Sequence, residues 1–309
     1  MGADLFSAPA PRPTSKLMRN ITEENLTQIV LDRTNTDDAR MNEIISKLIT
    51  HVHAFIRDVE PTEHEWFQAV DFLTRTGHMC DDKRQEFILL SDVLGVSMLV
   101  DAINHRGMGS ATETTVTGPF HAAAPIREMG ANVAEGPELA RAKENGQETI
   151  VSGVITDDAG NPIEGALIDI WQADDIGFYD VQDENQPDQN LRGLFKTGAD
   201  GKYWFRTIRP NYYPVPTDGP VGELLNAAGR HPMRPSHIHF MIGAPGYERL
   251  ITHIFSDGDE YLDSDAVFGV KESLIAPYEV VDSAERAAEL GFNNPFMEMK
   301  FDFVLKKSG

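Results

Sequence analysis

Residues 149–173 read TIVSGVITDDAGNPIEGALIDIWQA, and this stretch decides how the larger part of the chain is expected to fold. Residues 149–156 form a short apolar run, and residues 166–173 alternate apolar and polar side chains, which is typical of strands. The nine residues between them, DDAGNPIEG, gather Asp, Gly, Asn and Pro, which favour turns. The pattern predicts two short strands joined by a tight polar connection.

The same pattern continues towards the C-terminus. Residues 194–208 (LFKTGADGKYWFRTI) read as two strands around an Ala-Asp-Gly turn. Further strands are predicted at residues 237–244, 250–255 and 297–306. Short strands at near-regular spacing predict an antiparallel β-sandwich, which we place at residues 106–309.

The first hundred residues carry a helical pattern instead. Residues 22–33 and 37–59 repeat apolar side chains every three or four positions, as amphipathic helices do. Thr62 and Glu65 form a capping box before the next helix, which Gly77 is expected to end, and residues 82–104 are predicted to form one further helix. The predicted fold class is α+β, with a helical domain of residues 1–105 before the β-sandwich domain.

Composition narrows the classes of protein to consider. The chain has 309 residues, 41% of them hydrophobic, and a formal net charge of -22, which disfavours a nucleic-acid partner. No apolar run is long enough for a membrane span. The first residues, MGADLFSAPAPRPTSK, lack the basic start and apolar stretch of a secretory signal, and Cys80 is the single cysteine. A cytoplasmic location is therefore expected.

The sequence RPSHIHF at residues 234–240 is the most informative for chemistry. On a strand, residues two apart face the same way, so His237 and His239 would project from one face about 7 Å apart at their roots. Two imidazoles placed like this can chelate a metal ion. The same pair also fits two ordinary surface or core histidines, because an H-x-H pair alone is a weak signal.

A metal ion would need further ligands, and several remain open. Acidic residues are abundant, so a site with two histidines and one carboxylate is one possibility. Tyr179 and Tyr213 are another, because both follow predicted strands, where a β scaffold places functional side chains. Most tyrosines are packing residues. Tyr212 competes with Tyr213, since neighbours in an extended segment point oppositely.

Six segments together resemble one family. These segments are GPF (118–120), DIWQADDIGFYD (169–180), YPVPTDGPVG (213–222), GRHPMRPSHIHF (229–240), APGYERLITHIF (244–255) and GDEYLDSDAVFG (258–269). The set is similar to the intradiol ring-cleavage dioxygenases, from the helical first hundred residues to about residue 305. The resemblance implies a non-haem iron(III) ion held by Tyr179, Tyr213, His237 and His239. It also implies a catecholic substrate and O2, with Tyr213 as the ligand that the substrate displaces and as a proton acceptor.

The closest resemblance within that family is to the hydroxyquinol 1,2-dioxygenases, which open 1,2,4-trihydroxybenzene to 3-hydroxy-cis,cis-muconate, the enol form of maleylacetate. Enzymes of plain catechol usually carry Gln where this chain has His253, and chlorocatechol enzymes share some of the segments. The resemblance implies catalytic roles for Arg234, which would stabilise negative charge, and for His253. It implies substrate contacts from Leu89, Asp92, Val116, Gly118, Pro119, Phe120, Val215, Pro216 and Val267.

Asp92 has a particular expected role. Leu89 and Asp92 are three residues apart and share one helix face. The carboxylate could accept a hydrogen bond from the third hydroxyl of hydroxyquinol, which would discriminate against a ring that lacks it. A solvent-exposed Asp92 is the alternative.

Assembly and other functions complete the predictions. The N-terminal helices carry more apolar surface than they need, which often marks an interface. The resemblance implies a homodimer through these helices, with a phospholipid sometimes bound between them. A non-enzymatic β-sandwich binding module and a zinc hydrolase on the histidine pair are the alternatives, and both explain fewer of the motifs.

Overall fold

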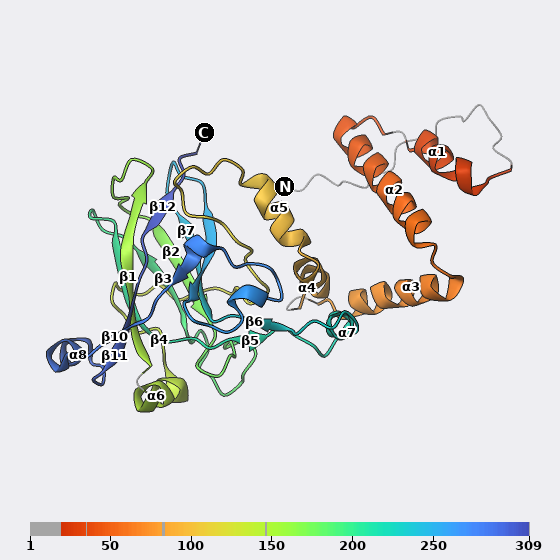
Figure 1. Cartoon of the computed structure of the whole chain (residues 1–309). Coiled ribbons are helices and arrows are strands. Elements are labelled where there is room, and N and C mark those ends of the chain that lie inside the picture. The colour runs from red at the N-terminus through yellow and green to blue at the C-terminus, as the bar shows by residue number, and fades with distance from the viewer. Residues whose placement is uncertain (1–19, 35, 82–83, 146, 309) are drawn as a thin grey trace. The chain divides into compact units, whose positions relative to one another are not determined.

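The computed structural model describes residues 20–34, 36–81, 84–145 and 147–308, which form two compact units (Figure 1). One unit ends at Leu73 and the other begins at Thr74. The boundary at residue 105 stays a prediction. The N-terminal stretch for which the sequence predicts no secretory signal lies outside the described residues. In the part of the chain that is described, no helix has the length and apolar character needed to cross a bilayer.

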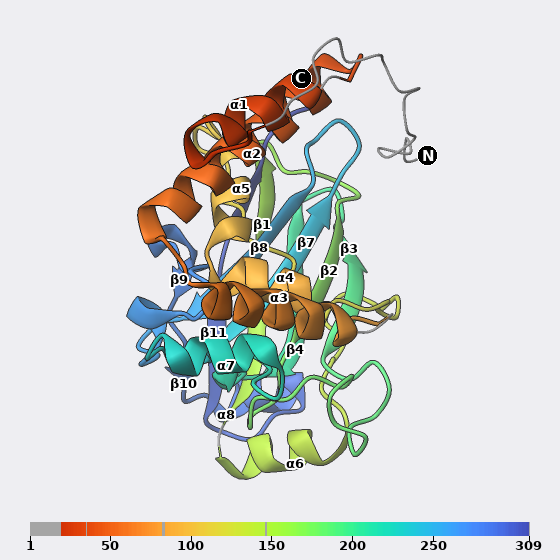
Figure 2. The same ribbon diagram turned by 90° about the vertical axis from the view of Figure 1, so that its right-hand side faces the viewer.

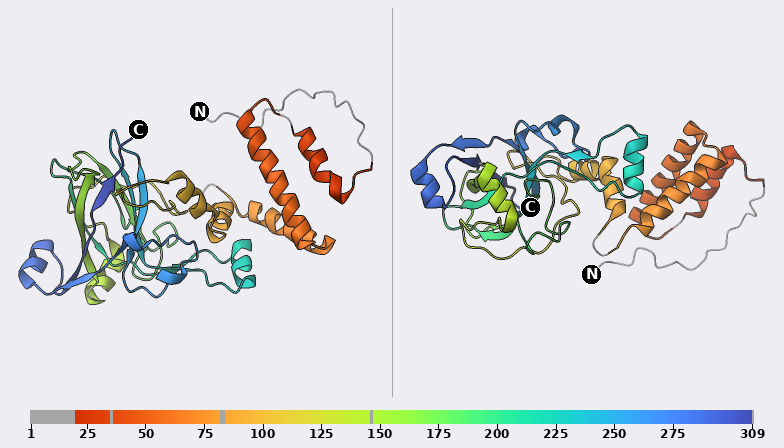
Figure 3. Two further views of the ribbon diagram at one scale, coloured as in Figure 1. Left: turned by 45° about the horizontal axis from the view of Figure 1, so that its top comes forward. Right: turned by 90° about the horizontal axis from the view of Figure 1, so that it is seen from below.

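The N-terminal helices begin close to the predicted positions. They are α1 (Glu23–Arg33), α2 (Ala39–Val59) and α3 (Glu63–His78). Helices α1 and α2 lie side by side (Figure 3), and a hydrogen bond of 3.0 Å joins the Thr27 hydroxyl to His53 Nδ1. The capping box is present, since the Thr62 N–H donates to the Glu65 carboxylate and the Glu65 N–H donates to the Thr62 hydroxyl. Gly77 lies inside α3, which ends one residue later.

The prediction of one helix over residues 82–104 is wrong. The described part of this segment forms α4 (Glu86–Val93) and α5 (Val96–Asn104), and residues 82–83 lie outside the described chain. The break is at Gly95, whose φ of +72° is left-handed and whose N–H donates to the Asp92 carbonyl. The apolar pattern runs across this break, so periodicity alone did not reveal it.

Twelve strands in the described residues form two five-stranded sheets and one small two-stranded sheet. The first sheet contains β1 (Glu148–Asp157), β4 (Lys202–Ile208), β10 (Glu279–Val281), β11 (Phe296–Lys300) and β12 (Phe303–Leu305). The second has the order β3-β2-β7-β8-β9 and contains β2 (Leu167–Gln172), β3 (Arg192–Lys196), β7 (His237–Gly243), β8 (Leu250–Ser256) and β9 (Ile275–Ala276) (Figure 2). The small sheet pairs β5 (Tyr213–Pro214) with β6 (Met233–Arg234).

The pairing differs from the antiparallel prediction in two ways. Strand β1 pairs in parallel with β11 and β12, and β8 pairs in parallel with β9, so both large sheets are mixed. The Ala-Asp-Gly turn does not close a hairpin, because β3 pairs with β2 and β4 pairs with β1 in the other sheet. The residues of a turn determine where the chain changes direction. Which strands then pair depends on how their buried faces pack against strands that are distant in the sequence.

Residues of both large sheets share one buried core. The Phe240 ring on β7 lies 6.1 Å from Tyr203 and 4.8 Å from Phe303, measured between ring centroids, and both partners belong to the first sheet. Ile238 and Ile242 are fully buried in the same core. One face of β7 is therefore committed to the core, and the opposite face is free to carry polar side chains.

The region predicted as all-β also contains helices. These are α6 (Gly136–Asn145), α7 (Pro220–Ala227) and α8 (Ala284–Leu290), with short 3-10 turns at Leu262–Ser264 and Glu272–Leu274. Helix α8 has a Ser283 cap and a left-handed Gly291 at its end, which are readable signals. Helix α7 begins with Pro220 inside a segment rich in Pro and Gly, which resembles a loop. The chain is a mixed helix and sheet fold.

Candidate active site

The two histidines of β7 lie on the face that points away from the core. His237 and His239 are each 1% exposed, and their Nε2 atoms are 3.1 Å apart. Their neighbour Ile238 is fully buried on the core side. Strand alternation therefore brings both imidazoles to one point, as the spacing predicts.

Two tyrosine hydroxyls meet the histidines at that point. Tyr179 follows β2 after a tight turn, and Tyr213 begins β5. The Tyr179 oxygen lies 3.2 Å from the Tyr213 oxygen and 3.0 Å from His239 Nε2. The Tyr213 oxygen lies 3.4 Å from His237 Nε2. The ring of Tyr212 instead contacts Tyr261 at a centroid distance of 4.9 Å.

These four atoms form a closed ring whose edges are 3.0–3.4 Å long. Donor atoms bound about 2.0–2.2 Å from one metal ion at angles between octahedral and tetrahedral are about 2.8–3.6 Å apart. The observed edges fall within that interval, so the arrangement fits a single metal ion. Two imidazole nitrogens and two phenol oxygens are a donor set suited to a hard, highly charged ion.

The charge states of the isolated site also suit metal binding. Burial and the nearby Arg234 guanidinium lower the pKa of His237 to about 3, and burial lowers the pKa of His239 well below its usual value. Both imidazoles are therefore neutral at physiological pH, with lone pairs available for a metal. Burial, and then the neighbouring Tyr213, raise the pKa of Tyr179 well above its usual value. A bound cation would supply the charge that favours the phenolate, with release of a proton.

Neighbouring groups fix the orientation of both imidazoles. His237 Nδ1 lies 2.6 Å from the Pro235 carbonyl, which assigns the proton to Nδ1 and leaves Nε2 free to bind a metal. The His239 ring stacks on Trp171 at 4.5 Å and 14°. Gly118, at φ +73°, approaches His239 so closely that a Cβ there would lie 3.3 Å from its Cε1. Trp171 and the backbone at Gly118 thus both pack against the His239 ring.

Arg234 is buried beside these donors and paired with a carboxylate. Its Nε and one terminal nitrogen lie 3.1 and 3.3 Å from the two oxygens of Asp265. Its other terminal nitrogen lies 3.4 Å from the Tyr213 oxygen and 3.2 Å from His237 Nε2. Burial opposes the charge of Arg234, but Asp265 outweighs it and the pKa of Arg234 is raised above its usual value. A permanent cation therefore contacts two of the four donor atoms, the Tyr213 oxygen and His237 Nε2.

His253 lies next to the pair, on β8. It is opposite His239 in the strand register, and the two ring centroids are 4.2 Å apart. His253 Nδ1 lies 3.0 Å from the Thr115 hydroxyl, whereas its buried Nε2 has no partner among the described residues. Ligand atoms of His237, His239 and His253 all lie within 4.8 Å of one another. An unpartnered Nε2 can contact a bound substrate, which keeps His253 a candidate site residue.

A cavity of about 750 Å³ lies beside the donors. It connects to them through Phe120, whose ring stacks on Tyr179 at 4.7 Å, and through Gly118. Five of the nine residues predicted to contact substrate line it, namely Leu89, Gly118, Pro119, Phe120 and Pro216. It is also lined by Arg84, Gln85, Glu86, Ile88, His121, Ala122, Val181 and Gln182, which sequence reasoning missed.

The other four predicted contact residues are not part of that lining. Val215 and Val267 pack with Leu89 in one buried cluster, and Val116 is half-buried. Asp92 is 4% exposed, so the solvent-exposed alternative is wrong. Burial raises the pKa of Asp92, while a hydrogen bond with Ser97 and the charge of Arg234 oppose that rise.

Two supporting residues were also missed in the sequence. Asp265 lies within the segment GDEYLDSDAVFG, but four acidic side chains there gave no means of choosing among them. Arg230 donates hydrogen bonds to the carbonyls of Val93 and Ala266, which joins the end of α4 to the loop that carries Val267. Because both carbonyls come from segments far from Arg230 in the sequence, no pattern around residue 230 predicts these contacts.

Comparison with known proteins agrees with this geometry. The family model described as "Dioxygenase" matches residues 117–307, and that described as "Catechol dioxygenase N terminus" matches residues 38–112. Together they span most of the chain, which therefore belongs to the intradiol ring-cleavage dioxygenases and is an oxidoreductase of that class.

Individual relatives refine the comparison. The chain is 51% identical over 290 residues to a hydroxyquinol 1,2-dioxygenase of Rhizobium sp. (strain MTP-10005), covering 93% of this chain and 96% of the relative. It is 52% identical over 263 residues to a 6-chlorohydroxyquinol 1,2-dioxygenase of Cupriavidus pinatubonensis, covering 84% and 93%. The crystal structure of hydroxyquinol 1,2-dioxygenase from Pseudomonas putida DLL-E4 superposes with a TM-score of 0.84 at 47% identity, covering 93% and 99%.

Proposed function

We propose that this protein is a hydroxyquinol 1,2-dioxygenase that uses a non-haem iron(III) ion. The observation that carries the metal assignment is the closed ring of donor atoms from Tyr179, Tyr213, His237 and His239, with edges of 3.0–3.4 Å. Phenolate oxygens suit a trivalent ion, and two phenolates with one hydroxide balance its charge. The substrate assignment rests on the relatives named for hydroxyquinol cleavage, which are 45–51% identical to this chain.

Iron(III) bound by these four residues would act as a Lewis acid towards both oxygens of an ortho-diphenol and make the ring reactive towards O2. The reaction adds both atoms of O2 and breaks the bond between the two adjacent hydroxylated carbons. Hydroxyquinol then gives 3-hydroxy-cis,cis-muconate, the enol form of maleylacetate.

The chain's own residues have distinct roles in this proposal. Tyr213 accepts the proton that a substrate hydroxyl loses on binding. Arg234 presents one terminal nitrogen to the Tyr213 oxygen and stabilises the negative charge that develops on the ring. His253 offers its unpartnered Nε2 to a substrate oxygen. The stacked Phe120 and the aliphatic Leu89 exclude water from the reacting ring.

Asp92 is proposed to recognise the third hydroxyl of hydroxyquinol. It is buried on the same face of α4 as Leu89, which lines the cavity. The Asp92 carboxyl group already has a hydrogen bond with the Ser97 side chain, so the third hydroxyl would pair with its remaining acceptor sites. A ring without that hydroxyl would leave those sites unpaired and would bind less well. Gly118, Pro119, Pro216, Val116, Val215 and Val267 complete the proposed contacts.

The visible absorption spectrum of the iron-reconstituted protein tests the proposal. A broad phenolate-to-iron band is expected, and hydroxyquinol added without oxygen should shift it to longer wavelength. Admission of O2 should then consume one O2 per substrate and give maleylacetate. A protein that stays colourless with iron, or that binds stoichiometric zinc and hydrolyses esters, would refute it. Parallel turnover of catechol, chlorocatechols and 6-chlorohydroxyquinol decides among the related substrates.

The N-terminal helices are proposed to form a homodimer interface. Helix α2 buries none of its residues, and a line of large apolar side chains on it is exposed at 42–60%, namely Ile44, Leu48, Val52, Phe55, Ile56 and Val59. A single apolar stripe of this extent is unusual on a free surface. Light scattering should report a dimer, and Leu48→Glu should give a monomer. Organic extraction followed by mass spectrometry detects any bound phospholipid.

A further inference from the structure

Two turns of this protein share one hydrogen-bond pattern. They are Asp157–Asn161 (DDAGN) and Asp174–Phe178 (DDIGF). In the first, Asp157 Oδ1 accepts the N–H groups of Ala159 and Asn161 at 3.0 and 2.9 Å. In the second, Asp174 Oδ1 accepts those of the residues two and four positions later at 3.0 and 2.8 Å. In each turn the Asp N–H also donates to the carbonyl four residues on, and the Gly N–H donates to the Asp carbonyl.

The surroundings of the two turns differ in one decisive respect. Gly160 and Gly177 both have positive φ, +80° and +91°. A Cβ on Gly160 would meet nothing within 4 Å. A Cβ on Gly177 would lie 2.7 Å from the Tyr212 carbonyl oxygen and 3.0 Å from Tyr213 Cβ. The second turn is thus in tight contact with the backbone that carries one phenol of the site.

The second turn is joined to both phenols. Tyr179 directly follows it, and the N–H of Tyr179 donates to the Gln182 side chain at 3.1 Å. On the other side, the Asp174 carbonyl accepts the N–H of Asn211 at 3.0 Å, two residues before Tyr213. One five-residue turn therefore connects the two segments that supply the oxygen donors.

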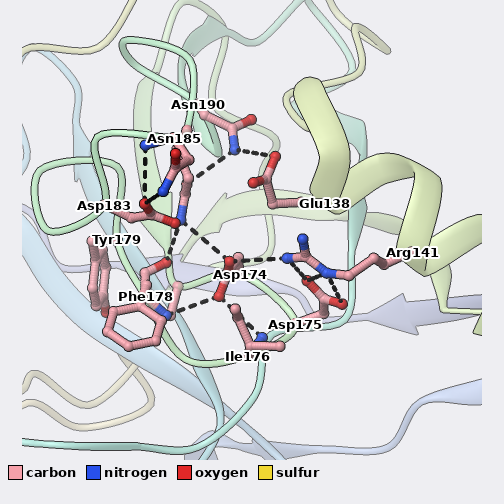
Figure 4. A network of polar contacts seen from close by, with 12 residues as sticks. Glu138, Arg141, Asp174, Asp175, Ile176, Phe178, Tyr179, Asp183, Asn185 and Asn190 are labelled. Carbon is pink, nitrogen blue, oxygen red and sulfur yellow. Dashed lines mark hydrogen bonds and ion pairs between the residues drawn. The ribbon is translucent and has the colours of Figure 1, made fainter.

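A buried polar network anchors the turn to the rest of the fold (Figure 4). Asp174 Oδ2 lies 3.3 Å from Arg141 and 3.3 Å from the amide nitrogen of Gln186, and that amide also donates to the Phe178 carbonyl. Asn190 extends the network from Gln186 to Glu138 on α6. Asp174 is fully buried, so this network has little freedom to rearrange.

We propose that the Asp174–Phe178 turn positions both phenol oxygens for metal binding, with Gly177 and Asp174 as its positioning residues. This inference rests on the proposed iron site. Gly177 sets how closely the Tyr213 backbone approaches, and Asp174 fixes the turn that leads into Tyr179. Groups that orient metal ligands commonly change affinity by about 10–100-fold when they are altered.

Gly177→Ala tests the proposal, with Gly160→Ala as the matched control. Both variants place a side chain at a positive φ in the same type of turn, so the backbone strain is shared. Only the first also pushes on Tyr213. The apo proteins are titrated with iron against a competing chelator, and the visible band is recorded per bound iron. Thermal unfolding monitors the fold.

Gly177→Ala should lower the apparent iron affinity by about 10–100-fold and alter the band per bound iron, while Gly160→Ala should keep the iron affinity and the band of the wild type. Equal iron affinity and equal spectra in both variants would overturn the positioning role. If Gly177→Ala does not fold, Asp174→Asn is compared with Asp157→Asn. Each variant keeps the oxygen that accepts the N–H groups of its turn and places an amide beside a cation, which is Arg141 for Asp174 and Lys307 for Asp157. Weaker iron binding in Asp174→Asn alone supports the positioning role, and equal iron affinity in the two variants overturns it. A wild type without any iron band would instead reject the proposed function itself.

Discussion

Replacement of Asp265 by asparagine should expose the energetic cost of the buried cation at this site. The Arg234–Asp265 pair is nearly inaccessible, with the two residues 3% and 5% exposed. Asp265→Asn keeps the shape but leaves the guanidinium without its carboxylate. Removing one partner of a buried ion pair costs about 3–5 kcal/mol. At about 2–4 °C per kcal/mol for a unit of this size, the melting temperature should fall by about 6–20 °C.

The same variant should lose activity, because Asp265 holds two nitrogens of Arg234 so that the third faces Tyr213. Displacement of a positioned group by about 1 Å can reduce the rate on the order of 10²-fold. Thermal unfolding and steady-state oxygen uptake measure the two effects. Glu248→Gln is the control, since its pair with Lys306 is more than a third exposed and should contribute at most about 1 kcal/mol.

The difference in stability between the wild type and Asp265→Asn should also depend on pH. Burial raises the pKa of Asp265, but Arg234 and the backbone donors outweigh it, and the pKa lies below its usual value. A lowered pKa means that the carboxylate stabilises the fold fully above the unfolded-state value near 4 and that this contribution is lost as pH falls through the folded-state value. The difference in melting temperature between the wild type and Asp265→Asn should therefore become smaller below about pH 4. A difference that is small at pH 7, or that becomes larger in acid, would refute the assignment of a desolvated ion pair.

Three further outcomes are expected. Asp92→Ala should reduce the ratio of kcat/KM for hydroxyquinol to kcat/KM for catechol by about 10–150-fold, which is the equivalent of one hydrogen bond to a charged group. An unchanged ratio would show that Asp92 does not take part in substrate recognition. Tyr179→Phe should weaken iron binding at least about tenfold and diminish the visible band, whereas Tyr212→Phe should keep both, so equal losses would contradict the ligand assignment. Removal of iron by a chelator should lower the melting temperature, since a ligand held at 100 times its Kd stabilises the folded state by about 2.7 kcal/mol, and unchanged unfolding would argue against an occupied site.

Strand periodicity alone was sufficient to place the two histidines. His237 and His239 share a face because their strand alternates, and Ile238 and Phe240 fill the core on the opposite face. No periodic pattern marks Tyr179, which directly follows the Asp174–Phe178 turn, a turn that is held by Gln186 and Arg141. Its candidacy came from its place after a strand and from the resemblance of the surrounding segment.

The local sequence does not predict which strands pair with each other. The turn after β3 was recognised, yet β3 and β4 belong to different sheets. Strand β1 pairs in parallel with β11 and β12, about 150 residues further along the chain. Such pairings depend on which apolar faces fit together once the chain has collapsed, so they cannot be predicted from about ten neighbouring residues. The break at Gly95 was missed for a related reason, because the apolar spacing of α4 continues into α5.

The two phenols are held in different ways, and this difference supports the roles proposed for them. Tyr179 is fully buried, its ring stacks on Phe120 at 4.7 Å, and its backbone N–H is tied to Gln182. Tyr213 instead has its oxygen 3.4 Å from a terminal nitrogen of Arg234, in a two-residue strand. A phenol oxygen that leaves a metal ion in a buried site still needs a polar neighbour, because a buried polar atom without a partner is costly. The Arg234 guanidinium is such a neighbour for Tyr213, which supports the proposal that Tyr213 is the donor displaced by substrate and that Tyr179 remains bound.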